Sequence, residues 1–180
     1  AMQGVVSLLD ERHWALVEDV WAELARDFGV SGVSITPFPH FSYQIATHYD
    51  PAALATALVP LARQTAPFRV RTTGLGVFTG AQPVLYLPVV RNPALTRLHE
   101  TLWQLTAPIA TERSPYYEPP NWMPHITLGY GDLTPASLSA IVRELATRDF
   151  NWDIPIDNFA FGTDGEETQQ VAFRVPLQGT

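Results

Sequence analysis

A four-residue motif occurs twice in this chain, and the second copy lies 85 positions after the first. Two further matches follow in the same order, at offsets of 84 and 83. The matched pairs are Pro39-His40-Phe41-Ser42 with Pro124-His125-Ile126-Thr127, Asp50-Pro51 with Thr134-Pro135, and Gly76-Val77-Phe78 with Phe159-Ala160-Phe161. One match can arise by chance, but several at nearly one offset predict two α/β lobes related by a pseudo-twofold axis.

The spacing of apolar residues predicts which elements each lobe contains. Helical periodicity covers residues 11–28, and three more helices are expected where a capping side chain precedes proline, at 50–51, 92–93 and 134–135. Runs of β-branched and aromatic residues predict strands at 4–9, 40–46, 68–78, 84–90, 125–130, 152–161 and 171–175. The 180 residues suit one α/β domain, residues 1–180, with lobes at about 4–79 and 84–176.

The charge of the chain limits its partners. The formal net charge is −7, and all basic residues are arginine. An acidic protein binds long nucleic acid poorly, because that affinity comes mainly from neutralising many phosphates, so we expect no long duplex partner. A single phosphate needs only a few local donors. No apolar run is long enough to cross a bilayer, so we expect no membrane partner. No secretory leader opens the chain, and we take a cytoplasmic location as the default. We also expect a monomer.

The repeated motif carries groups suited to phosphate chemistry. Side chains alternate along a strand, so His40 and Ser42 share one face, as do His125 and Thr127. The twofold relation places all four in one groove. Two imidazoles can act as paired acid and base near neutral pH. The hydroxyls of Ser42 and Thr127 can hold the non-bridging phosphate oxygens. We therefore predict His40 and His125 as catalytic and the two hydroxyl residues as phosphate-binding.

The motif by itself has little specificity, since His99-Glu100-Thr101 also fits it. That copy lies within a predicted helix, where we expect His99 on the surface. The predicted strands, the preceding prolines and the repeat distinguish the other two copies. The chain has no cysteine, no His-x-His and no Glu-x-x-His pair, so we expect neither a metal nor another cofactor.

Other side chains are candidates for binding the rest of a substrate. Arg71 alternates with apolar residues on its predicted strand and is a candidate phosphate ligand, with a solvent-exposed arginine as the alternative. An insertion at 111–122, rich in proline and aromatic residues, precedes the second motif. Its Tyr117 and Trp122, together with Tyr43 and Tyr130, are candidates for stacking on a base. The alternative for each is packing in the core.

On these motifs, and on the segments 74–78 and 84–87, the chain resembles the 2H phosphoesterase superfamily, in particular its 2′-5′ RNA ligase-like and cyclic phosphodiesterase-like members. The resemblance implies an α+β type of α/β fold, in which antiparallel sheets line a central groove and helices lie outside. It implies His40 and His125 as acid and base, and a 2′,3′-cyclic phosphate or 2′-5′ linkage as substrate, in a small nucleotide or an RNA end.

One departure from the family pattern concerns the residues after the second motif. Family members often carry a basic residue there, whereas this chain has Gly129-Tyr130-Gly131-Asp132. The departure argues against ligase activity and long RNA. We expect a metal-independent phosphoric diester hydrolase. The alternative is a non-catalytic module that binds a nucleotide or an RNA end. The symmetry of the motifs leaves open which histidine is the acid.

Overall fold

The computed structural model describes residues 2–180 and contains four helices packed on antiparallel sheets. In chain order the elements are β1 (Gln3–Leu8), α1 (Glu11–Phe28), η1 (Gly32–Ile35), β2 (His40–Tyr49), α2 (Pro51–Gln64), β3 (Phe68–Arg71), β4 (Gly76–Phe78), β5 (Val84–Pro88), α3 (Pro93–Thr106), η2 (Ala107–Ile109), β6 (Ala110–Arg113), η3 (Pro115–Tyr117), β7 (His125–Gly129), α4 (Pro135–Leu145), β8 (Asp153–Ile156), β9 (Asn158–Asp164) and β10 (Gln169–Pro176).

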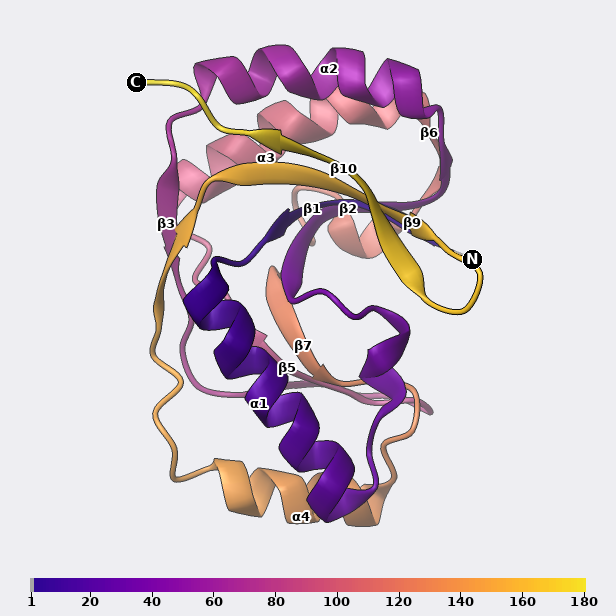
Figure 1. Cartoon of the computed structure of the whole chain (residues 1–180), viewed down its shortest axis with the longest axis vertical. Coiled ribbons are helices and arrows are strands. Elements are labelled where there is room, and N and C mark those ends of the chain that lie inside the picture. Colours follow the sequence, from indigo (N-terminus) through magenta and orange to yellow (C-terminus); the bar gives the residue numbers. More distant parts are fainter. Residues whose placement is uncertain (1) are drawn as a thin grey trace.

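The strands form three sheets, and the strand pairs within them are antiparallel. One sheet has the order β10-β9-β1-β2-β6, another has β4-β5-β7, and β3 pairs with β8. Helices α2 and α3 lie at the end of the molecule next to the five-stranded sheet, while α1 and α4 lie at the end next to β5 and β7 (Figure 1). The predicted α+β class with antiparallel sheets and outer helices is confirmed.

The sheets do not follow the two sequence ranges expected for the lobes. β1 and β2, from the range 4–79, share a sheet with β6, β9 and β10, from the range 84–176. β4 from the first range pairs with β5 from the second. Residue patterns specify that a segment is a strand, but the choice of partner depends on the whole chain. The boundary between the sheets therefore differs from the expected boundary between the lobes.

Capping residues followed by proline correctly predicted where three of the helices begin. Asp50, Asn92 and Thr134 each accept a backbone N–H at a helix start, and proline follows each of them. Two predicted strands, 68–78 and 152–161, are each interrupted, and β6 was not predicted. Within residues 2–180, no helix combines the length and the apolar character needed to cross a membrane.

Candidate active site

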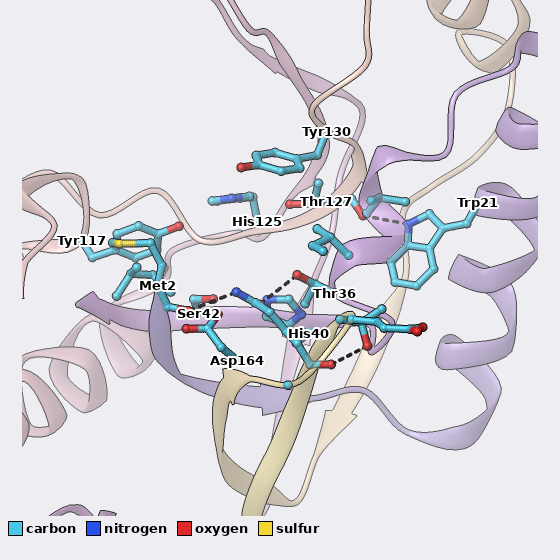
Figure 2. Close-up of a pocket in the computed structure, with 17 residues that line it drawn as sticks. Met2, Trp21, Thr36, His40, Ser42, Tyr117, His125, Thr127, Tyr130 and Asp164 are labelled. Carbon is cyan, nitrogen blue, oxygen red and sulfur yellow. Dashed lines mark hydrogen bonds between the residues drawn. The ribbon is translucent and has the colours of Figure 1, made fainter. Parts of the chain in front are cut away.

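The two motif histidines open the strands β2 and β7, which belong to different sheets. A cavity of about 520 Å³ lies between these strands, and its lining includes His40, Ser42, His125 and Thr127. Figure 2 shows His125 and Thr127 on one side of this cavity and His40 and Ser42 on the other. The structure thus brings together all four residues of the repeated motif.

Both imidazoles are oriented in the same way. His40 Nδ1 lies 2.7 Å from the carbonyl oxygen of Phe38, and His125 Nδ1 lies 2.8 Å from that of Met123. A carbonyl oxygen only accepts, so Nδ1 carries the proton in each ring. In the neutral form of either histidine, Nε2 is therefore the basic nitrogen that can exchange a proton with a ligand.

Burial shifts the protonation of both rings. It lowers the pKa of His40 to about 4, and the charge of His125 also lowers this pKa. The hydrogen bond to the Phe38 carbonyl opposes the shift. Burial also lowers the pKa of His125, with the Met123 carbonyl opposing the shift. Because removal from water disfavours the charged imidazolium, both rings favour the neutral form in the unliganded protein.

The surroundings of the two rings differ. His125 has three aromatic neighbours, with ring centroids at 4.9 Å from Phe78, 5.2 Å from Tyr86 and 6.4 Å from Tyr117. His40 packs on Phe38, with centroids 5.2 Å apart. Aromatic rings attract a cation near their faces, so the neighbours of His125 are better suited to an imidazolium.

Two tryptophans hold the strands at the hydroxyl positions. The indole N–H of Trp21, on α1, donates to the backbone oxygen of Thr127 at 3.0 Å. The indole N–H of Trp122 donates to the backbone oxygen of Ser42 at 2.9 Å. Each hydrogen bond fixes a backbone carbonyl beside a candidate phosphate ligand, which limits movement of the hydroxyl.

The insertion 111–122 is packed against the domain. Trp122 is only 2% exposed, and its ring stacks on His99 with centroids 3.8 Å apart and an interplanar angle of 3°. Arg91 lies 5.6 Å from the Trp122 ring centre and donates to the backbone oxygens of Trp122 and Pro119. Nothing in the sequence around Arg91 indicated this role. The expectation that His99 lies on the surface was wrong, because this stack buries it completely.

The stacking candidates divide into two groups. Tyr43 is fully buried and its hydroxyl forms a hydrogen bond with Ser7, so neither Tyr43 nor Trp122 is accessible to a substrate. The prediction that these two stack on a base was wrong, because both side chains complete the core. Tyr117 and Tyr130 do line the cavity, and Tyr130 is 48% exposed. Their role as stacking residues stays a prediction.

The arginine prediction was also wrong in its placement. Arg71 is exposed on β3, opposite Asp153 on β8, and does not line the cavity. Within residues 2–180, no arginine lines the cavity, whereas Asp164 and Glu167 do. Asp164 is the last residue of β9, and Glu167 lies in the turn that joins β9 to β10.

A second cavity of about 600 Å³ adjoins the first. The two share Tyr117, His125, Thr127 and Tyr130 in their linings. The remaining lining of the second cavity is mostly apolar, with Val77, Phe78, Thr79, Val84, Tyr116, Asn121 and Met123. Over residues 2–180, there is no cluster of three or more His, Cys, Asp or Glu side chains suited to holding a metal ion.

Sequence comparison identifies relatives of this chain. The family model described as the 2′-5′ RNA ligase superfamily matches residues 9–167. A candidate phosphoesterase of Bacillus mycoides (strain KBAB4) is 30% identical over 107 residues, which are 59% of this chain and 58% of that protein. A candidate phosphoesterase of Geobacillus kaustophilus (strain HTA426) is 28% identical over 106 residues, 59% of this chain and 57% of that protein. The matched region thus spans less than two thirds of these relatives.

Solved structures share the fold over almost the whole chain. TT0787 of Thermus thermophilus has a TM-score of 0.71 and 21% identity, covering 99% of both chains. Escherichia coli LigT complexed with 3′-AMP has a TM-score of 0.59 and 16% identity, covering 98% of this chain and 99% of LigT. LigT complexed with ATP has a TM-score of 0.58 and 15% identity, covering 98% and 97%.

Proposed function

Because the chain belongs to the 2′-5′ RNA ligase superfamily, we propose that it is a metal-independent phosphodiesterase acting on a 2′,3′-cyclic nucleotide phosphate or a 2′-5′ linkage. The observation that carries the proposal is the cavity lined by two imidazoles and two hydroxyl residues, with both Nδ1 atoms bonded to a carbonyl two residues earlier. Paired imidazoles supply both proton transfers that in-line hydrolysis of a diester requires.

The differences between the two rings support a separate role for each. His40 has its pKa lowered to about 4, so it is neutral and accepts the proton of the attacking water at Nε2. His125, among three aromatic rings, takes up a proton when the phosphate anion binds beside it, since a nearby negative charge raises the pKa of an imidazole, and gives that proton to the leaving oxygen. The water oxygen bonds to phosphorus as the bond to the leaving oxygen breaks. Ser42 and Thr127 donate hydrogen bonds to the non-bridging oxygens, where charge develops.

The walls of the two cavities support a nucleotide as the substrate. Tyr117 and Tyr130 border both cavities and present aromatic surface to a base. The related LigT has been solved in complex with 3′-AMP and with ATP, which supports a nucleotide as ligand. A small nucleotide or an RNA end therefore suits the site better than a long duplex.

The proposal is tested with the four nucleoside 2′,3′-cyclic monophosphates in the presence of a chelator, measuring release of the 2′- and 3′-phosphates. We expect turnover that survives the chelator and is lost in His40→Ala and in His125→Ala. His48→Ala is the matched control, because His48 is exposed on the same strand as His40 and lies outside the cavity lining. Full activity in either motif variant would contradict the proposal.

A second candidate function is binding without turnover. It is favoured by the segment after Thr127, where Asp132 accepts the backbone N–H groups of Ser31 and Gly32, and by the cavity lining, which contains no arginine within residues 2–180. A protein that is stabilised against heat by 3′-AMP, but forms no product from any cyclic phosphate on long incubation, would be a binding module.

A further inference from the structure

The turn between β9 and β10, together with the strand ends at Asp164 and Gln169, forms one wall of the cavity that holds the two motif histidines. The residues of this segment in the cavity lining are Asp164, Gly165, Glu167, Thr168 and Gln169. Figure 2 shows Asp164 on the side of the cavity where His40 and Ser42 lie. This wall belongs neither to the repeated motif nor to the predicted stacking residues, and its charge is opposite to that expected of a phosphate-binding surface.

Hydrogen bonds hold this wall against the cavity. The Gln169 side chain accepts from the Thr36 hydroxyl at 2.9 Å and donates to the backbone oxygen of Met2 at 3.0 Å. The turn is closed by a hydrogen bond from Gly165 N to the oxygen of Thr168 at 2.9 Å. A Cβ at Gly165 would lie 2.4 Å from that same oxygen, so the turn depends on glycine at this position. The acidic side chains are thus carried on a fixed support.

The negative charge of the wall is not paired with an arginine in the part of the chain that the structure describes. Within residues 2–180, neither Asp164 nor Glu167 belongs to an ion pair, and no arginine lines either cavity. Four arginines are paired with carboxylates elsewhere, and Arg91 is bound to the insertion. A ligand in the cavity therefore meets two carboxylates whose charge no arginine of the lining offsets.

We propose that Asp164 and Glu167 determine specificity by restricting the cavity to phosphodiesters that carry a single negative charge. The inference rests on the proposed function, since it takes the diester phosphate to lie between the two histidines. A ligand with a further phosphate places about two more negative charges near the wall, and like charges repel in proportion to their product. Nucleosides with a 2′,3′-cyclic phosphate and a free 5′-hydroxyl fit this restriction, whereas 5′-phosphorylated ones do not.

The test compares adenosine 2′,3′-cyclic phosphate with its 5′-phosphorylated form at low ionic strength. The proteins are the wild type, Asp164→Asn, Glu167→Gln and the double variant. We expect the wild type to prefer the 5′-hydroxyl substrate, and the double variant to reduce this preference in kcat/KM by about fivefold. Added salt should reduce the wild-type preference in the same direction, because it screens exposed charges.

Glu166→Gln is the matched control. Glu166 lies in the same turn and carries the same charge, but it does not line the cavity. We expect it to change the preference by less than about twofold, because its charge lies outside the cavity that holds the ligand and Coulomb repulsion weakens with distance. An equal change in Glu166→Gln would show that net charge, rather than the cavity wall, sets the preference, and would overturn the inference.

Two outcomes separate this inference from the proposed function. Turnover that depends on His40, with the same preference in the wild type and the double variant, would overturn the inference alone. If no cyclic phosphate is turned over, calorimetric titration with 3′-AMP and adenosine 3′,5′-bisphosphate measures the same preference in binding. A change in the ratio of the two Kd values in the double variant would then support the inference about Asp164 and Glu167, although the catalytic proposal has failed. An unchanged ratio would overturn this inference as well.

Discussion

The two copies of the motif have the same local structure in different surroundings. In both, the histidine opens a strand, its Nδ1 bonds to the carbonyl two residues earlier, and a tryptophan binds the backbone oxygen of the hydroxyl residue. Both rings are desolvated, but their neighbours differ: His40 packs on Phe38, whereas His125 lies among three aromatic rings. The shared sequence thus sets the geometry, while the surroundings distinguish the two proposed chemical roles.

The tryptophans show how matching contacts arise from unmatched positions. Trp21 precedes the first motif but binds the second, while Trp122 lies two residues before the second motif but binds the first. They are 101 positions apart, well outside the 83 to 85 of the repeat. The two strands of the site therefore accept matching hydrogen bonds from two tryptophans, although the sequence repeat does not relate these tryptophans to each other.

The largest expected effect is the loss of activity when either motif histidine is replaced. His40→Ala and His125→Ala should each lower kcat by roughly 10²- to 10⁴-fold, the usual contribution of a positioned acid or base. The double variant should lose little more than the worse single variant, because the two groups act as a unit. Steady-state kinetics on one cyclic phosphate measures all three. Losses that multiply would contradict a joint acid and base.

The hydroxyls test whether the two motifs hold the phosphate equally. Ser42→Ala and Thr127→Val should each reduce kcat by about a hundredfold, since each removes one donor to the developing charge. Thr47→Val on β2 is the control, because its hydroxyl donates to the backbone of Thr111. Equal losses would indicate a phosphate midway between the strands, and an effect in Thr47→Val as large as in Ser42→Ala would contradict the assignment.

The tryptophans should differ in their effect on stability. Trp122→Phe removes the partner of the Ser42 carbonyl in the core and should lower the free energy of unfolding by about 1–3 kcal/mol. Trp21 is only partly buried, so Trp21→Phe should cost about 0.5–1.5 kcal/mol. Urea unfolding measures both. A larger loss in Trp21→Phe would show that burial does not decide the difference.

The pH dependence of stability contributed by His40 should be smaller than the effect of Trp122→Phe. Its pKa is about 4 in the folded protein against about 6.5 when unfolded, so the unfolded chain binds more protons between these values. Its contribution to stability is complete above pH 6.5 and is lost as the pH falls towards 4. Between about pH 6.5 and 5, the wild type should lose about 1–2 kcal/mol more than His40→Gln, as measured by urea unfolding. Parallel losses in the two proteins would contradict a neutral His40.

Much of the fold was predictable because its signals are short-range. A capping side chain followed by proline placed the starts of α2, α3 and α4, and alternation placed the two motif residues on one strand face. The pairing of β1 with β9 and of β2 with β6 was not predictable, since apolar alternation identifies a strand without identifying its partner. The predicted position of Arg71 in the groove was wrong for the same reason, because the partner of its strand could not be identified from the sequence.

The sequence by itself determined the repeated motif, its residue types and the helix boundaries, because these depend on neighbours a few positions away. Only the tertiary structure decided which aromatic residues are accessible, burying Tyr43 and Trp122 while leaving Tyr130 at the cavity. It also placed Asp164 and Glu167 in the wall of the cavity that holds the two motif histidines. Burial and the charge of a cavity wall are sums over distant segments, so they are fixed only when the whole chain has packed.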